Sequence, residues 1–309
     1  MVCIIIVTHN NGNTLRNALD SLINSDNEFI NEIVIVDNNS TDNTRFIIDE
    51  FFYEHRDLIR KIELKQNLGF PWAVNIGFKL CKYKEPYFAL FNPDAIATKG
   101  WLKELVYFMN KNDCVGMAQS LLIKPGGEYD CAGGFINKLG YPLEFKPRID
   151  YKTLSKLKPY EIGYAKGAAV LIRTKAFLQV GGFDNRYFFY YDEVDLSYRM
   201  RKYGWKIYLV PKSIVIHIGL GSKIPNKELF VLYYMERNHL LFLYKNIRSR
   251  FIPALIWSLA GALHEKSSIR MRIRLQAIRD AIKLVMGRKV RDPIQFTIKE
   301  TYRFLNKTL

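Results

Sequence analysis

The feature that most constrains this chain is an unbroken apolar run, Ile33–Val36, that ends in Asp37 and leads through three small polar residues to a plausible helix start. Such a run is typical of a parallel strand whose two faces are both buried. The strand would deliver Asp37 to its carboxyl end, where open α/β sheets place ligands, and Ser40 or Thr41 would cap a following helix. A carboxylate at that edge is suited to accept hydrogen bonds from the base or sugar of a nucleotide. A turn that binds nothing is the simpler alternative.

The first half of the chain alternates strand and helix patterns, which predicts a mostly parallel central sheet covered by helices on both faces. The predicted strands are 3–8, 32–37, 61–65, 87–91 and 115–123, and the predicted helices are 14–23, 41–52, 72–81 and 99–110. From residue 124 to about 160, glycine and proline turn signals dominate. Beyond them we expect a strand at 168–173, a helix at 195–203, strands at 207–210 and 214–217, and helices from Lys227 onward.

The positive charge of the chain is concentrated towards its C-terminal end. The net charge is +16, and Leu240–Leu309 holds 15 Lys and Arg residues against 4 Asp and Glu residues. There, 251–263 is apolar and 268–288 places apolar residues at helical spacing among basic ones. A basic amphipathic helix suits an anionic membrane surface or nucleic acid, and a helix packed on the main domain with a solvated basic face is the alternative. We therefore expect a main domain at 1–245 and a helical, basic extension at 246–309.

Four cysteines, Cys3, Cys81, Cys114 and Cys131, are scattered without a Cys-x-x-Cys spacing. This arrangement argues against a zinc site and against a disulfide framework, so we expect reduced thiols of a cytoplasmic protein. The N-terminus runs into a strand pattern and shows no basic region or cleavage site of a signal peptide. The apolar run 251–263 is too short to span a bilayer as a helix, which leaves peripheral membrane contact as the expectation.

Three acids in four positions, Asp192, Glu193 and Asp195, follow five consecutive aromatic residues. Like charges this close together, beside aromatic surfaces, raise the pKa of at least one carboxyl group, as a general base requires. Asp195 has Arg199 one helical turn later, so we expect an orienting role for Asp195. The working acid is then Asp192 or Glu193. The alternative is a solvated acidic helix start, against which the aromatic run argues.

Asp94 ends another apolar strand pattern, directly after Asn92 and Pro93. A carboxylate at the end of a strand is suited to bind a divalent cation that neutralises a diphosphate, and a turn or helix cap is an equally simple role. His217 ends a later strand pattern and precedes two glycines. It is a candidate second ligand for the same cation, whereas a histidine packed in the core is the commoner alternative.

Two asparagines and two glycines lie at the junction of the third predicted strand and the third predicted helix: Asn67 and Gly69 come before the helix, and Asn75 and Gly77 lie within it. Gly69 would let the backbone approach a ligand, and Gly77 would let the helix pack closely against the sheet. A helix entry capped by Asn67 is the alternative for this segment. Arg237, in a later helical stretch, is a candidate phosphate ligand, a salt bridge being the commoner use.

Taken in order, these motifs resemble glycosyltransferase family 2, a family of inverting enzymes with the GT-A fold. More narrowly, they are similar to its rhamnosyltransferase-like branch, which builds cell-surface glycans. The resemblance covers about residues 1–245. The motifs are Val7-Thr8-His9-Asn10, Val36-Asp37-Asn38-Asn39-Ser40-Thr41-Asp42, Asn67-x-Gly69-Phe70, Asn92-Pro93-Asp94, Gly181-Gly182-Phe183-Asp184, Asp192-Glu193-x-Asp195, His217-x-Gly219-x-Gly221-Ser222 and Arg237-Asn238.

The resemblance implies a role for each motif. Asp94 and His217 would hold Mg²⁺ or Mn²⁺ on the donor diphosphate. Glu193 aligns with the family's base, which is usually the Asp of a Glu-Asp pair. The order here is Asp-Glu, which leaves the choice between Asp192 and Glu193 open, with Asp195 as the orienting acid. The donor-binding residues would be Thr8, Asn10, Asp37, Asn39, Asn67, Gly69, Asn92 and Arg237.

The implied reaction moves a sugar from dTDP-rhamnose or a UDP-sugar to a hydroxyl of a glycan or polyprenyl-linked acceptor, in the synthesis of a cell-surface polysaccharide or glycoprotein. The carboxylate would take the proton of the acceptor hydroxyl, which attacks the anomeric carbon opposite the nucleotide and inverts its configuration. The enzyme would work in the cytoplasm or on the inner face of the cell membrane. An oligomer is compatible with the sequence, and no nucleic acid is expected as a partner.

Two other functions remain as alternatives at this point. A nucleotidyltransferase usually needs a glycine-rich basic loop near its N-terminus, and residues 8–16 offer only Gly12 and Arg16. A basic nucleic-acid-binding protein would use the C-terminal extension, but the first half has no RNA-binding aromatic motif and no helix-turn-helix signature that we recognise.

Overall fold

The structure is a computed structural model that describes residues 2–25, 28–219 and 226–290. The chain divides into two compact units, Met1–Phe230 and Val231–Leu309. The first unit is a mixed α/β structure, and the described part of the second is helical. The expected boundary after residue 245, as the end of the catalytic part, stays a prediction.

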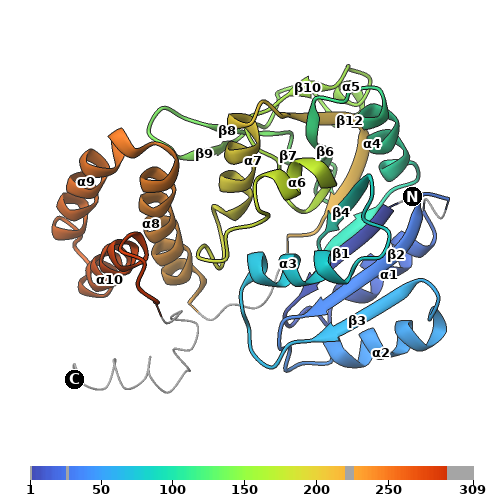
Figure 1. The fold of residues 1–309 in the computed structure, drawn as a ribbon, viewed down its shortest axis with the longest axis horizontal. Coiled ribbons are helices and arrows are strands. Elements are labelled where there is room, and N and C mark those ends of the chain that lie inside the picture. Colours follow the sequence, from blue (N-terminus) through green and yellow to red (C-terminus); the bar gives the residue numbers. More distant parts are fainter. Residues whose placement is uncertain (1, 26–27, 220–225, 291–309) are drawn as a thin grey trace. The chain divides into compact units, whose positions relative to one another are not determined.

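A single large sheet forms the centre of the first unit (Figure 1). The strands are β1 Val2–Thr8, β2 Ile30–Asp37, β3 Ile59–Glu63, β4 Tyr87–Phe91, β5 Ala95–Ala97, β6 Val115–Ile123, β7 Tyr129–Cys131, β8 Gly134–Ile136, β9 Pro142–Glu144, β10 Tyr160–Glu161, β11 Ala169–Arg173 and β12 Lys206–His217. The sheet order is β10-β12-β6-β11-β4-β1-β2-β3, while β8 and β9 form a separate hairpin. The pairings β4-β1-β2-β3 and β6-β12 are parallel, and β11 is antiparallel to both its neighbours. The predicted mostly parallel sheet flanked by helices is therefore confirmed.

Helices cover both faces of the sheet (Figure 1). They are α1 Leu15–Ile23, α2 Thr44–Glu54, α3 Phe70–Leu80, α4 Trp101–Asn110, α5 Tyr151–Leu154, α6 Thr174–Gln179 and α7 Asp192–Lys202. Side chains alternate along each strand, so Ile4 and Ile6 pack in one buried cluster with residues of α1, α2 and α4, whereas Ile5 packs in another with residues of α3, α6 and α7. Each central strand is apolar at consecutive positions because both of its faces are buried.

Gly77 explains how α3 lies so close to the sheet. A Cβ atom on Gly77 would lie 2.6 Å from Cγ2 of Ile5 in β1 and 3.2 Å from Cγ2 of Val36 in β2. Real Cβ atoms do not approach carbon this closely, so only glycine lets the helix pack at this distance. The expectation of close helix packing at Gly77 is confirmed.

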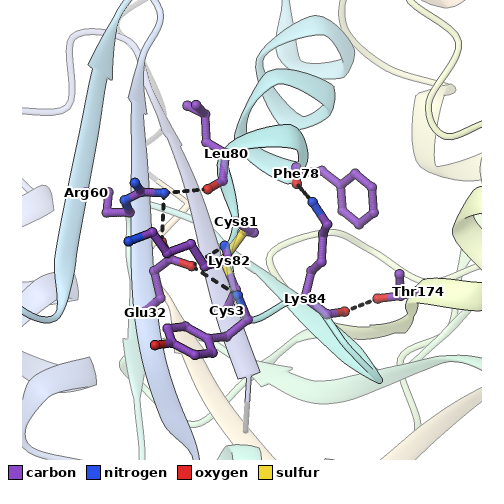
Figure 2. The surroundings of a disulfide bond; sticks show 10 residues. Cys3, Glu32, Arg60, Phe78, Leu80, Cys81, Lys82, Lys84 and Thr174 are labelled. Atoms are coloured by element: carbon purple, nitrogen blue, oxygen red, sulfur yellow. Dashed lines mark hydrogen bonds and ion pairs between the residues drawn. A yellow bond between two sulfur atoms is a disulfide. The ribbon is translucent and has the colours of Figure 1, made fainter.

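The expectation that all cysteines are reduced is wrong for one pair. Cys3 in β1 and Cys81, just after α3, form a disulfide, with Cα atoms 6.1 Å apart (Figure 2). The buried carboxylate of Glu32 lies beside them, where it accepts a hydrogen bond from the Lys82 amide at 2.8 Å and pairs with Arg60 at 3.3 Å. The two cysteines are 78 positions apart, so no local spacing motif could have indicated the bond. Cys114 and Cys131 are free.

Several short elements were not predicted from the sequence. The segment expected to be rich in loops contains β7, β8, β9, α5 and β10, and α6 follows β11 directly. The two strands expected at 207–210 and 214–217 are one strand, β12, whose register against β6 shifts between Val210 and Ile214. Pro211 lies in that shift, where a residue without an amide hydrogen is tolerated.

The second unit continues the helical part of the chain, as predicted. Its helices are α8 Lys227–Asn246, which begins in the first unit, a 3₁₀ turn at Arg248–Arg250, α9 Phe251–Leu263 and α10 Ser268–Val285. Tyr233 donates to Asp280 at 3.0 Å, and Arg274 pairs with Glu236 at 3.2 Å, so polar contacts join α8 to α10. Among the described residues, every helix is too short or too polar to cross a membrane.

Candidate active site

Thr8 and Asp37 lie side by side at the carboxyl ends of β1 and β2, because the parallel register pairs these two positions. Asp37 is fully buried. Its carboxylate accepts from the Thr8 hydroxyl at 3.2 Å, from the Ser40 amide at 3.2 Å and from Arg45 Nε at 2.9 Å. These bonds fix the carboxylate at the edge of the sheet that was expected to take a nucleotide.

Two of the asparagines predicted to bind the donor, Asn10 and Asn39, shape the loops after these strands. Asn10 and Asn39 have left-handed backbones, with φ of 57° and 66°, a conformation that asparagine tolerates better than most residues. The Asn10 side chain accepts from the Thr41 amide at 2.7 Å, and Asn39 Oδ1 lies 3.4 Å from Arg45 Nη2. The loops after β1 and β2 are thus tied to each other.

Asn67 and Gly69 connect the end of β3 with the start of α3. Asn67 Oδ1 accepts from the Asn38 side chain at 2.8 Å and from the Gly69 amide at 2.9 Å. Gly69 has a φ of +84°, and a Cβ there would lie 2.6 Å from the carbonyl oxygen of Phe188. Glycine is therefore required here by the aromatic segment 187–191, independently of any ligand.

Asp94 and His217 face each other although 123 residues separate them in the sequence. The short strand β5, directly after Asp94, pairs with the end of β12 and brings the two together. Asp94 Oδ1 lies 3.3 Å from His217 Nε2, and Asn92 Nδ2 also lies 3.3 Å from that nitrogen. Both Asp94 and His217 are buried, so the carboxylate oxygen and the imidazole nitrogen that face each other are largely shielded from solvent.

Sequence reasoning missed Asp130, the group on the far side of the imidazole. Asp130 Oδ2 lies 2.9 Å from His217 Nδ1 and 2.9 Å from Lys166 Nζ, and Lys166 also lies 3.1 Å from Glu144. Asp130 and Glu144 come from β7 and β9, in the segment that was expected to be rich in loops. An isolated acid between turn residues carries no signal of such a partner.

This cluster shifts the pKa values of its members. Burial alone would lower the pKa of His217, but its hydrogen bonds to Asp130 and Asp94 outweigh burial and raise the pKa to about 9. Burial opposes ionisation of Asp130 as well, yet His217 and Lys166 bring the pKa of that carboxyl well below its usual range. Asp130 is therefore a carboxylate that holds the proton of the imidazole on Nδ1.

Glu193 and Asp192 begin α7 and are held differently from Asp195. Glu193 Oε1 accepts from the Gly167 amide at 2.7 Å, and a Cβ on Gly167 would lie 2.5 Å from that oxygen. Asp195 accepts from the Tyr187 hydroxyl at 3.0 Å and from Arg199 Nε at 2.7 Å. The side chain of Asp195 is thus held by Tyr187 and Arg199. Gly167, like Asp130, is a site residue that was not predicted from the sequence.

The two acids at the start of α7 have raised pKa values. Burial raises the pKa of Glu193 to about 7, even though the Gly167 amide and Lys166 favour its charged form. Burial and the charge of Glu193 raise the pKa of Asp192 well above its usual range. A carboxyl group that ionises near neutral pH has the proton affinity that a general base requires.

The aromatic segment before these acids has an unusual backbone. Phe188, Tyr190 and Tyr191 have φ values of 63°, 63° and 65°, which bulky residues seldom adopt. Tyr191 donates to the carbonyl of Gly140 at 3.2 Å, and the Phe70 amide donates to the carbonyl of Phe188 at 2.8 Å. Such local strain persists only where the surroundings hold it, often at functional sites.

Two predicted motifs fall outside the described part of the first unit. Gly221 and Ser222 lie outside the described residues. Arg237 belongs to the second unit and is buried there. Its Cζ atom lies 4.7 Å from the ring centre of Tyr234, and its Nε atom donates to Asn238 Oδ1 at 2.9 Å. Its proposed contact with the donor stays a prediction.

Comparison with known proteins gives a consistent result. A family model described as glycosyl transferase family 2 matches residues 3–181. The chain is 29% identical to N-acetylglucosaminyl-diphospho-decaprenol L-rhamnosyltransferase of Mycobacterium tuberculosis, over 92% of this chain and 98% of that protein. It is 26% identical to rhamnosyltransferase WbbL of Escherichia coli K12, over 70% of this chain and 83% of that protein.

Solved structures are similar in fold. The chain superposes on GalNAc-T7, crystallised with UDP, GalNAc and Mn²⁺, with a TM-score of 0.65 at 18% identity, over 90% of this chain and 54% of that one. It superposes on the mannosyltransferase PcManGT of Pyrobaculum calidifontis, in complex with GDP-Man and Mn²⁺, with a TM-score of 0.56 at 16% identity, over 98% of this chain and 79% of that one.

Proposed function

Because the chain belongs to glycosyltransferase family 2 and has its GT-A fold, we propose that it is a metal-dependent, inverting enzyme. It would transfer a sugar from a nucleotide diphosphate to a hydroxyl group. The observation that carries the proposal is the meeting of Asp94 and His217 at 3.3 Å beside the carboxyl end of β4. In open α/β sheets this edge is where ligands bind. Thr8, Asp37 and Asn67 would line the nucleotide part of the pocket.

The residues present fit a divalent cation. Asp94 offers a hard oxygen, a ligand that suits both Mg²⁺ and Mn²⁺. The imidazole nitrogen of His217 suits a transition-metal ion such as Mn²⁺ better than Mg²⁺. Asp130 binds the opposite ring nitrogen of His217, so Nε2 is the nitrogen that would face a cation, as in many metal-bound histidines. Because the pKa of this imidazole is about 9, a cation would have to displace the proton on Nε2. When bound, the cation would neutralise charge on the departing diphosphate.

The acids of α7 would supply the proton chemistry. We assign Glu193 as the base, because the Gly167 amide holds its carboxylate in place and its pKa is about 7. It would take the proton from the acceptor hydroxyl as that oxygen attacks the anomeric carbon from the face opposite the nucleotide, which inverts the configuration. Asp192 is the second candidate, and Asp195 would orient the start of α7 through Tyr187 and Arg199.

The relatives suggest the substrates. A polyprenyl-linked acceptor and a rhamnosyl donor such as dTDP-rhamnose are favoured, because a relative that the chain matches over nearly its whole length is named N-acetylglucosaminyl-diphospho-decaprenol L-rhamnosyltransferase. A UDP-sugar remains the second candidate donor. The proposed place of the reaction is the inner face of the cell membrane, in the synthesis of a surface glycan.

Donor binding tests this proposal without an acceptor. Thermal unfolding of the full chain would be followed with Mn²⁺ and either dTDP-rhamnose, UDP-glucose, GDP-mannose or ATP. We expect dTDP-rhamnose to raise the midpoint most, by several degrees at saturating concentration, and Asp94→Asn to remove most of that shift. A shift with ATP alone, or equal shifts for Asp94→Asn and the unaltered chain, would contradict a nucleotide-sugar site at Asp94.

A further inference from the structure

Helix α9 exposes an apolar face that the described residues of its unit leave uncovered. Its thirteen residues include no charged side chain. The side chains of Ile256, Trp257 and Leu263 are 62%, 77% and 70% exposed, and Ile252 and Leu259 are exposed as well. A continuous apolar surface of this kind seldom occurs without a partner on a soluble protein.

The exposed residues form one side of the helix. Ile252, Ile256, Leu259 and Leu263 are spaced by four, three and four positions, the spacing of neighbours on one helical face. The other side of the helix is buried. There the ring of Phe251 packs against the ring of Tyr244, and the two ring centres are 5.3 Å apart. The exposed face therefore does not belong to the core of the unit.

Part of the apolar pattern of α10, the helix that the sequence favoured for membrane contact, is packed inside the unit. Along 268–288, the positions expected to face a membrane include Ala277, Ile278 and Ala281, and these are buried. Together with Leu284 they form the packed side of α10. This part of the amphipathic pattern of α10 serves the fold of the unit, and α9 presents the free apolar surface instead.

The exposed charged residues among those described in the second unit are all basic. The acids described in the second unit each contact a basic partner: Glu236 with Arg274 at 3.2 Å, Glu265 with Arg270 at 3.4 Å, and Asp280 with Lys283 at 3.2 Å. Exposed basic residues include Arg248 just before α9 and Lys266 just after it, as well as Arg272, Arg279 and Arg288. Two copies of so basic a surface would repel each other, whereas an anionic surface would complement it.

We propose that α9 lies in the interface of an anionic phospholipid bilayer, with its Ile252–Leu263 face among the acyl chains and the flanking basic residues at the headgroups. A helix of thirteen residues is about 20 Å long, shorter than the hydrocarbon core, so it lies in the plane of the interface. Trp257 is the side chain best suited to that depth. The purpose of this contact rests on the proposed function, because a polyprenyl-linked acceptor is found at a bilayer.

Vesicle flotation of the full chain tests the surface directly. The vesicles would be phosphatidylcholine alone or an equal mixture of phosphatidylcholine and phosphatidylglycerol. We expect flotation with the anionic vesicles only, and a loss of at least about tenfold in partitioning for Ile256→Ser with Trp257→Ser, since both side chains lose apolar area. Phe46→Ser is the matched control, because Phe46 is 69% exposed on α2 of the first unit.

Two outcomes would overturn the proposal. The first is equal flotation of the double variant and the unaltered chain. The second is that the unaltered chain does not float with anionic vesicles and is a dimer by light scattering, whereas the double variant is a monomer. That result would assign the apolar face of α9 to contact with a second copy of the chain. Donor binding, measured by thermal unfolding, is independent of vesicles, so a failure here is distinguishable from a failure of the proposed transferase activity.

Discussion

Asp130 Oδ2 lies 2.9 Å from His217 Nδ1, and the opposite ring nitrogen of His217 lies 3.3 Å from Asp94. One carboxylate thus orients the imidazole, while the other shares with it the place where a cation would bind. Lys166, at 2.9 Å from Asp130, keeps the orienting carboxylate charged. Asp130 is in this view a positioning residue that acts through His217.

Replacing this orienting carboxylate should weaken metal binding. Asp130→Asn leaves the shape of the side chain but removes its charge, and we expect the affinity for Mn²⁺, measured by isothermal titration calorimetry, to fall about 10- to 100-fold. Glu128→Gln is the matched control, because Glu128 is an exposed acid two positions away in the same segment. Unchanged Mn²⁺ affinity of a folded Asp130→Asn variant would mean that the carboxylate has no such role.

Gly167 offers a test of how the proposed base is held. In Gly167→Ala the new Cβ would start 2.5 Å from Glu193 Oε1, so the carboxylate must move and lose its bond to the amide. Since displacement of a reacting group by about 1 Å costs up to about 100-fold, we expect kcat to fall by at least about tenfold. Gly126→Ala should keep full activity, because no atom lies within 4 Å of its Cβ position. Equal kcat for both variants would argue against Glu193 as the base.

The Cys3–Cys81 disulfide should be detectable and should stabilise the first unit. Alkylation of the unfolded, unreduced chain should label two of the four cysteines, Cys114 and Cys131. Cys3→Ala with Cys81→Ala should lower the free energy of unfolding by about 2–4 kcal/mol, as is typical for a long closed loop. Cys114→Ala, an exposed free thiol, should change it little. Labelling of all four cysteines would show that the pair is reduced.

The parts of the fold that follow from local patterns were predictable. The run Ile33–Val36 indicated a buried strand and placed Asp37 at its end, because burial on both faces leaves a continuous apolar signature. Asp94 and His217 were predicted as a pair from the ends of two strands. Short antiparallel strands such as β7 and β9 were not, since three residues are too few to show a period.

What the sequence missed depends on contacts between distant residues. Asp130 meets His217 across 87 positions, and Cys3 meets Cys81 across 78, so neither pair shares a local motif. Gly167 is needed only because Glu193 reaches its amide. Along 268–288, sequence periodicity showed that one face is apolar, but not that part of this face packs inside its own unit, which only the three-dimensional arrangement reveals.

Whether Glu193 is the base of the transfer is tested most directly by the pH dependence of the single-turnover rate. The substrates would be dTDP-rhamnose and a short-chain polyprenyl-diphosphate acceptor. The base must be ionised to accept a proton. With a pKa of about 7 for Glu193, the rate should rise through neutral pH and level off above it. Glu193→Gln should lower the rate by about 10²- to 10⁴-fold and remove this rise, whereas Asp192→Asn should keep it. A Glu193→Gln variant with the unaltered rate and the same rise would contradict the account.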